Sequence, residues 1–140
     1  MSGISRATII IPPVILGQMV AHCRSCLPDE GCGILAGRGA TVTHIYPMKN
    51  IEPSPVSYHM DPQEQFDVMR SMRESALEMV AIYHSHPDSP ATPSHADIER
   101  AFYEDAAYVI VSFSGERPVV KAHRIEAGIA TETAIMEDPR

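Results

Sequence analysis

The sequence is poor in several features, and each shortage excludes a class of protein. Basic residues are outnumbered, with 11 lysines and arginines against 18 acidic residues and a net charge of −7 at pH 7. A nucleic-acid-binding protein needs a basic face to displace counterions from phosphates, so this balance argues against that class. No apolar run approaches the length of a membrane span. The opening residues also lack the pattern of a secretory signal, so we expect a cytoplasmic protein.

Cysteine is scarce, with three residues in a chain of 140. Three thiols cannot all pair within one chain, and a secreted disulfide scaffold would contain more of them. Cys23 and Cys26 form a C-x-x-C pair that fits redox or zinc chemistry, but no second pair completes a four-sulfur site. Because the pair falls within a helix-periodic apolar pattern, we interpret both thiols as small core residues.

The length and the content of apolar residues (44%) fit one globular domain spanning residues 1–140. No internal repeat, low-complexity tract or second domain is visible, and twelve prolines mark boundaries between elements. Hydrophobic periodicity predicts strands over 7–11, 31–37, 40–48, 56–60, 79–86, 107–113 and 118–125. Helices are predicted over 13–27, 61–77 and 94–103, and the tail 126–140 is ambiguous, with a last edge strand as one interpretation. Helices interrupting a mixed or antiparallel sheet predict an α/β fold with helices packed on the sheet.

The stretch HSHPDSPATPSHAD (84–97) gathers three histidines and two aspartates. His84 and His86 lie two apart at the end of a predicted strand, so both imidazoles point to the same face and can converge. A catalytic zinc takes three protein ligands, often histidines, and keeps its fourth position for water. Asp97, in the first turn of the next helix, is the candidate third ligand. His95 is an alternative, although its neighbouring helical position faces another direction.

Ordinary structure can explain each of these features taken singly. Ser94-x-x-Asp97 is close to a capping box, with Asp in place of Glu, and H-S-H-P fits a strand that exits into a proline turn. Their combination at one strand end favours a metal site. A zinc-activated water also needs a base, and spacing alone leaves five glutamates open: Glu30, Glu52, Glu64, Glu74 and Glu99. Four further histidines lack ligand spacing and are interpreted as surface or structural residues: His22, His44, His59 and His123.

The order His84-Ser85-His86, seven residues, then Ser94-x-x-Asp97 resembles the signature of the JAMM (MPN-plus) metalloisopeptidases. That signature is a distant Glu followed by H-[ST]-H, x7 and S-x-x-D, and every fixed position matches. The stretch EGCGILAG (30–37) is similar to the E-x-C-G-x-L-x-G region of the family and selects Glu30 from the five glutamates. The resemblance covers nearly the whole chain, whose short length fits the compact prokaryotic branch.

The resemblance implies a cytidine-deaminase-like α-β-α sandwich and one Zn²⁺ held by His84, His86 and Asp97. It also implies that Glu30 takes a proton from water and passes it to the leaving amine. Ser94 would support the oxyanion or the ligands, and Ser85 would be a structural hydroxyl. A zinc deaminase would instead show H-x-E and P-C-x-x-C, and neither is present.

The implied reaction is hydrolysis of an amide or isopeptide bond at the Gly-Gly tail of a ubiquitin-like or sulfur-carrier protein, releasing a residue such as cysteine. We expect the tail to add along the strand 56–60 and the Pro-rich loop before it. Two other classes stay open at this point: a non-catalytic binding module and a zinc hydrolase of short peptides. Fe²⁺ or Mn²⁺ in place of zinc, and the oligomeric state, stay open as well.

Overall fold

The computed structural model describes residues 8–138, so Ala7 of the first predicted strand, the rest of the opening residues and the last two residues of the tail lie outside the described residues. Strands and helices alternate along the chain in nearly the predicted order. The elements are β1 (Thr8–Ile10), α1 (Pro13–Cys26), β2 (Cys32–Arg38), β3 (Thr41–Met48), α2 (Pro62–Glu74), β4 (Glu78–His86), α3 (His95–Glu99), β5 (Ala107–Ser112), β6 (Val119–Glu126) and β7 (Ile129–Met136).

The strands form one mixed sheet that closes on itself in the order β1-β3-β2-β4-β5-β6-β7. The predicted mixed sheet with helices is confirmed, but its closure was not anticipated. The tail supplies the closing strand, because β7 pairs antiparallel with β6 and parallel with β1. β7 is therefore flanked on both sides, and the interpretation of the tail as an edge strand is wrong. Its position depends on β1, more than a hundred residues earlier in the chain.

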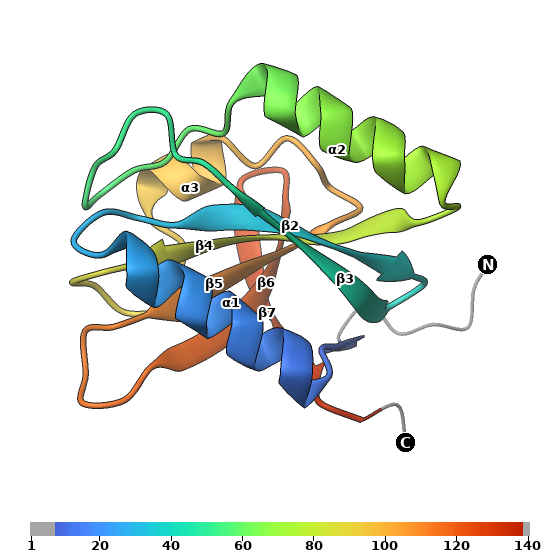
Figure 1. The fold of residues 1–140 in the computed structure, drawn as a ribbon. Coiled ribbons are helices and arrows are strands. Elements are labelled where there is room, and N and C mark those ends of the chain that lie inside the picture. Colours follow the sequence, from blue (N-terminus) through green and yellow to red (C-terminus); the bar gives the residue numbers. More distant parts are fainter. Residues whose placement is uncertain (1–7, 139–140) are drawn as a thin grey trace.

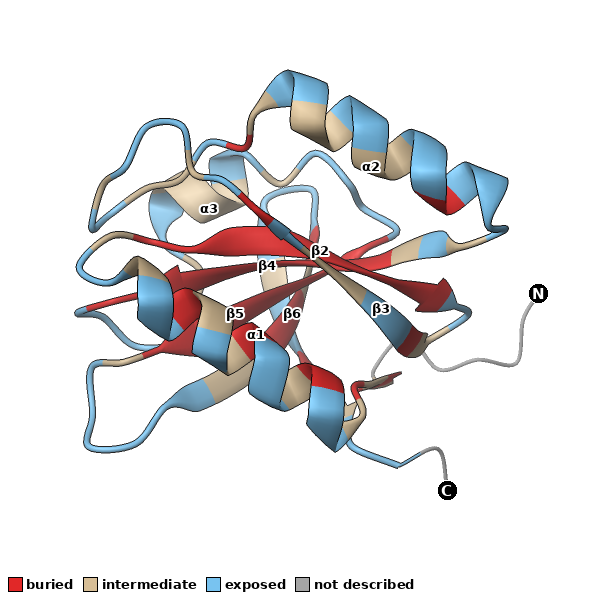
Figure 2. Cartoon of the chain, in the orientation of Figure 1, coloured by how far each residue is buried: buried red, intermediate tan, exposed pale blue. Residues whose placement is uncertain are grey.

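The helices cover opposite faces of the central strands, with α1 on one side and α2 on the other (Figure 1). Alternation along β4 sends Tyr83 into a core shared with Met19 of α1, and Ile82 into a core shared with Met72 of α2. The central strands are buried along most of their length (Figure 2). His84 and His86 follow Ile82 at intervals of two, so both imidazoles face the side that carries α2 and α3.

Local signals explain where the two shorter helices begin. Asp61 caps α2 by accepting a hydrogen bond from the Gln63 amide at 3.1 Å, and Pro62 occupies the first helical position. Ser94 caps α3 in the same way. The predicted extent of α3, to residue 103, is wrong because the helix ends at Glu99. The following segment turns back toward β5 instead, where the Tyr103 amide donates to the Tyr108 hydroxyl at 3.0 Å.

The segment 56–60 is not a strand, which corrects the prediction. Its only ladder contact within the described residues is an isolated bridge between Asn50 and Met60. The Asn50 side chain organises this loop, since its Nδ2 donates to the Ser57 carbonyl at 3.2 Å and its Oδ1 accepts from the His59 amide at 3.0 Å.

The three cysteines are free thiols, as predicted. Cys23 and Cys32 are buried, and Cys26 is half-buried at the end of α1. No residue of the C-x-x-C pair belongs to a metal-binding cluster within residues 8–138. The interpretation as core packing is thus confirmed for Cys23 and only in part for Cys26. In the same range, no helix is both long and apolar enough to cross a membrane.

Gly33→Ala should destabilise the protein by about 1–3 kcal/mol, because a Cβ at this position would lie 2.3 Å from the Tyr83 ring. The ring cannot withdraw cheaply, since Tyr83 is fully buried and its hydroxyl lies 2.7 Å from His22 Nδ1. Chemical denaturation of the variant measures the loss. Gly17→Ala in α1 is the matched control, because its Cβ meets nothing within 4 Å and it should be neutral or stabilising. Equal stability of the two variants would contradict the packing argument.

Candidate metal centre

Three side chains converge at the end of β4. The Nε2 atoms of His84 and His86 lie 3.2 Å apart, and each lies 3.1 Å from Oδ2 of Asp97. Bonds of about 2.0–2.2 Å in a tetrahedral zinc site place neighbouring ligand atoms about 3.3–3.6 Å apart, which is close to this spacing. Within residues 8–138 this is the only group of three such side chains whose ligand atoms lie this close together. The donor set fits a zinc ion.

The capping box and the candidate ligand are parts of one arrangement. The Ser94 hydroxyl accepts from the Asp97 amide at 3.1 Å, and the Ser94 amide donates to Oδ2 of Asp97 at 2.9 Å. A third-position aspartate that reaches back to the N-cap has its carboxylate fixed at the helix N-terminus. That same Oδ2 is the atom that faces both histidines. Capping therefore orients the carboxylate toward the site. Asp97 can be part of a capping box and a candidate metal ligand at the same time.

Backbone and ring contacts orient the two imidazoles. His86 Nδ1 lies 2.7 Å from the Pro90 carbonyl, so that nitrogen carries a hydrogen and Nε2 is the ring atom that faces Asp97 and is available to a metal ion. The His84 ring stacks on Tyr58, with ring centroids 4.7 Å apart and an interplanar angle of 25°. His84 is fully buried, so its ring has one orientation available between the strand and Tyr58.

Glu30 lies beside this cluster at the entrance to β2. The side chain is 3% exposed, and its Oε1 has no hydrogen-bond partner. Burial raises the pKa of Glu30 to about 8; the charge on His86 opposes this rise, and Asp97 adds to it. A buried carboxyl group without a partner for its Oε1, close to the His86 imidazole and to a second carboxylate, is an arrangement that a cation would stabilise.

The middle residue of H-S-H holds the Glu30 segment in place. The Ser85 hydroxyl accepts from the Gly31 amide at 2.8 Å, and the Ser85 amide donates to the Gly31 carbonyl at 3.1 Å. The Glu30 amide donates in turn to the Ser54 carbonyl at 2.8 Å. Ser85 points away from its two histidine neighbours, as strand alternation requires, and so fixes the segment that carries Glu30 from the opposite face. This agrees with the expected structural hydroxyl.

The electrostatics of the cluster favour an ionised aspartate. Burial alone would raise the pKa of Asp97, but hydrogen bonds from His84 and His86 outweigh it and lower that pKa. For His86, burial lowers the pKa, while the hydrogen bonds to Asp97 and Pro90 outweigh it and raise the value. The cluster thus combines the fixed negative charge of Asp97 with two imidazole nitrogens that can act as metal ligands, which is the pattern of a divalent cation site.

The alternative residues lie away from this cluster. The His95 side chain is 91% exposed and lies 3.7 Å from Glu99, so it takes no part in the convergence. Glu64 accepts from the Lys49 amide at 2.9 Å, and Glu52 and Glu74 are exposed. The remaining histidines divide as interpreted: His44 and His59 are exposed, His22 contacts Tyr83, and His123 is buried.

Sequence reasoning missed two residues that shape the site. Asn50 donates to the Glu30 carbonyl at 3.1 Å and also fixes the loop around Tyr58. Tyr58 covers the His84 ring. Tyr58 lies in the predicted strand 56–60 and Asn50 in the Pro-rich loop before it, and the one available signal was that both segments were expected to hold the substrate tail. Both lie close to the metal centre only because that loop folds back over the end of β4.

Comparisons with known proteins agree with this geometry. The family model described as prokaryotic homologs of the JAB domain matches residues 12–126. The CysO-cysteine peptidase of Mycobacterium tuberculosis is 40% identical over 131 residues, which cover 91% of this chain and 89% of the relative. The probable TtuB-protein conjugate cleaving protease of Thermus thermophilus is 35% identical over 116 residues, covering 82% of this chain and 77% of the relative.

The solved structures include a protein of Desulfitobacterium hafniense determined in solution, with a TM-score of 0.83 and 36% identity. The match covers 91% of each chain. The family model, the relatives and the fold thus agree, and the resemblance is confirmed. The chain belongs to the family of prokaryotic homologs of the JAB domain.

Proposed function

We propose that this protein is a zinc-dependent peptidase that hydrolyses an amide or isopeptide bond at the Gly-Gly tail of a ubiquitin-like or sulfur-carrier protein. The observation that carries the proposal is the convergence of His84, His86 and Asp97 beside the buried, unpartnered Glu30. The named activities of the relatives, which act on a CysO–cysteine bond and on TtuB–protein conjugates, support the substrate class. Their sequences match most of this chain.

His84, His86 and Asp97 would hold the zinc ion, which when bound supplies a Lewis acid for the scissile carbonyl and lowers the pKa of water. Glu30 accepts the proton that water loses on attacking the carbonyl carbon, and then delivers it to the nitrogen as the carbon–nitrogen bond breaks. The products are a carboxylate on the carrier tail and a free amine. His86 stays correctly oriented throughout because Pro90 holds its Nδ1–H.

The proposal gives Ser94 the role of assisting at the carbonyl oxygen. Its hydroxyl oxygen already accepts from the Asp97 amide, so the hydroxyl hydrogen stays available for donation. A donor aimed at the position where negative charge develops stabilises the transition state. Ser94 is exposed at the start of α3, where a bound tail can reach it.

The proposal also includes the fold class and the cellular compartment. The helices on opposite faces of the sheet support the cytidine-deaminase-like sandwich implied by the resemblance. The three free thiols support a reducing compartment, and we propose the cytoplasm.

The proposal predicts that a carrier ending in Gly-Gly-Cys loses its terminal cysteine, because the site cleaves after the second glycine. Intact-mass spectrometry of the carrier, with and without a chelator, measures the reaction. The free tripeptide Gly-Gly-Cys, lacking the carrier body, should be cleaved at least about tenfold less efficiently, since remote contacts contribute to transition-state binding. Equal turnover of tripeptide and carrier would support a short-peptide hydrolase. Tight carrier binding without cleavage by the zinc-loaded protein would support a binding module.

A further inference from the structure

A groove leads away from the metal centre, and it has two parts of very different width. The narrow part has a volume of about 10 Å³ and is bordered by Asp97, Ser57, Tyr58 and Arg100. The wide part has a volume of about 260 Å³, and its apolar wall includes Ile82, Phe102 and Tyr108. Tyr58 and Arg100 line both parts, so they stand at the junction. The groove thus runs from Asp97, a proposed metal ligand, to an apolar pocket.

The narrow part is tightly enclosed. Its volume of about 10 Å³ is close to the minimum that holds a single water molecule. A peptide that passes along this part has little space for a side chain, so we expect glycine next to the scissile bond. Two extended residues span about 7 Å. The residue before a glycine pair would then pass Tyr58 and enter the wide part.

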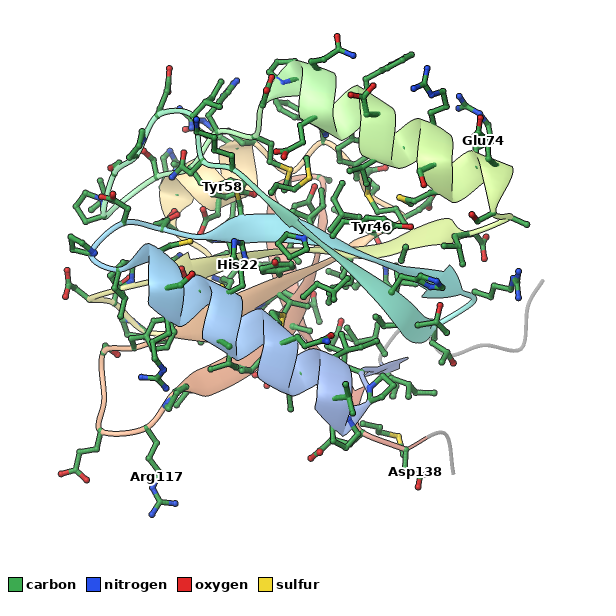
Figure 3. All side chains as sticks on the ribbon, viewed as in Figure 1. His22, Tyr46, Tyr58, Glu74, Arg117 and Asp138 are labelled. Atoms are coloured by element: carbon green, nitrogen blue, oxygen red, sulfur yellow. The ribbon has the colours of Figure 1, made fainter. Side chains whose placement is uncertain are left out.

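Tyr58 forms a rigid wall. The Asn50 side chain fixes both of its neighbours, by donating to the Ser57 carbonyl at 3.2 Å and accepting from the His59 amide at 3.0 Å. The Tyr58 ring also stacks on His84, which is itself fully buried. In Figure 3, Tyr58 lies near α3. A side chain held on both its backbone and its ring cannot move aside for a larger substrate residue.

We propose that Tyr58 is the specificity-determining residue of the site: its ring restricts the groove beside Asp97 to glycine, and the pocket behind it takes the apolar side chain that precedes the glycine pair. This inference rests on the proposed function and adds a structural reason for the Gly-Gly requirement. The pocket suits an apolar residue because Ile82 and Tyr108 are buried in its wall, and Phe102 is 78% exposed at its rim.

The test compares three carriers that differ only in the tail, ending in Gly-Gly-Cys, Ala-Gly-Cys or Gly-Ala-Cys. The wild-type protein should cleave at least one alanine tail about 10- to 200-fold less efficiently than the glycine tail, as kcat/KM. Tyr58→Ala should bring this ratio below about fivefold by opening the wall. Tyr58→Phe, which keeps the ring, should preserve the wild-type ratio. A purely structural role would lower all three rates together and leave the ratio unchanged.

Because Tyr58 packs on His84, the zinc content of each variant is measured alongside. If Tyr58→Ala does not retain metal, Tyr58→Leu provides the same comparison with a smaller side chain still covering the imidazole. A second measurement does not depend on turnover. Calorimetry on the Glu30→Gln background gives the Kd of the glycine and alanine tails, and Tyr58→Ala should bring the ratio of these Kd values closer to one. An unchanged ratio in both assays would overturn the assignment of Tyr58.

The wide pocket is tested separately. Replacing an apolar residue before the glycine pair by asparagine, which is polar but has no charge for Arg100 to pair with, should raise KM about tenfold. Phe102→Ala should raise KM without altering the glycine-to-alanine ratio. An unchanged KM in both cases would remove the pocket from the proposal. If the wild type cleaves the glycine and alanine tails equally well, the Tyr58 inference is refuted and the proposed function is not. Absence of cleavage of every carrier by the zinc-loaded wild type would refute the proposed function, and this inference with it.

Discussion

Glu30→Gln should lower kcat on a Gly-Gly-Cys carrier by about 100- to 10,000-fold while leaving the zinc content unchanged. Glutamine keeps the size of the side chain but cannot accept the proton that the attacking water loses. The segment stays in place because its anchors are the amide and carbonyl of Glu30, bonded to Ser54 and Asn50. Steady-state kinetics and metal analysis of the same preparation measure both effects.

The environment of Glu30 supports the proposal that it acts as the base. Burial raises its pKa to about 8, so without a cation it would be largely protonated at neutral pH. A divalent cation beside it favours the ionised form that can act as a base. Glu74→Gln is the matched control, because Glu74 is exposed at the end of α2 and far from the site (Figure 3). Retained hydrolysis in Glu30→Gln would remove this residue from the mechanism.

His86→Ala should reduce the zinc content from about one ion per chain to none after dialysis, because two ligands cannot hold a catalytic zinc. The loss of Nε2 also leaves Asp97 with one nitrogen neighbour instead of two. Elemental analysis of protein purified without a chelator or a histidine tag gives the stoichiometry. Thermal unfolding gives an independent measurement, since added zinc should raise the Tm of the wild type and not of the variant.

The control for this experiment is His95→Ala. His95 lies two residues from Asp97 in the sequence, but its side chain is 91% exposed, so its removal should leave one zinc per chain. If the His95 variant lost the metal and the His86 variant kept it, the proposed ligand set would be wrong and His95 would be a ligand in place of His86. Absence of metal from the wild type, even after dialysis against zinc, would contradict the metal centre and favour a capped loop in a binding module.

Local pattern accounts for much of the site. The histidine pair follows from a strand with side chains that alternate, and the position of Asp97 follows from a helix capped by Ser94. Both signals lie within fourteen consecutive residues, so no distant contact was needed to propose three ligands. The extents of β4 and α2 also agree with prediction to within a few residues, since each is bounded by strong local signals.

The predictions that were wrong depend on side-chain bonds and strand pairing that hydrophobic periodicity does not reveal. The segment 56–60 has a strand-like composition, but Asn50 organises it through side-chain bonds instead of a ladder. The sequence of the tail is ambiguous, with an edge strand as one interpretation. No short stretch of sequence shows that the tail pairs with β1. The helix predicted to residue 103 ends at Glu99, where the chain turns back toward β5.

The sequence by itself determined the mixed α/β fold class and the three candidate ligands, because strand alternation and helix capping act over a few residues. Spacing did not distinguish Glu30 from four other glutamates, and only the family motif selected it before the structure was known. The tertiary structure brought Glu30 beside the candidate metal centre through the contact of Gly31 with Ser85, 54 residues away, and it formed the groove at Tyr58. The register between β2 and β4 decides that contact, and register depends on the packing of the whole sheet rather than on any short stretch.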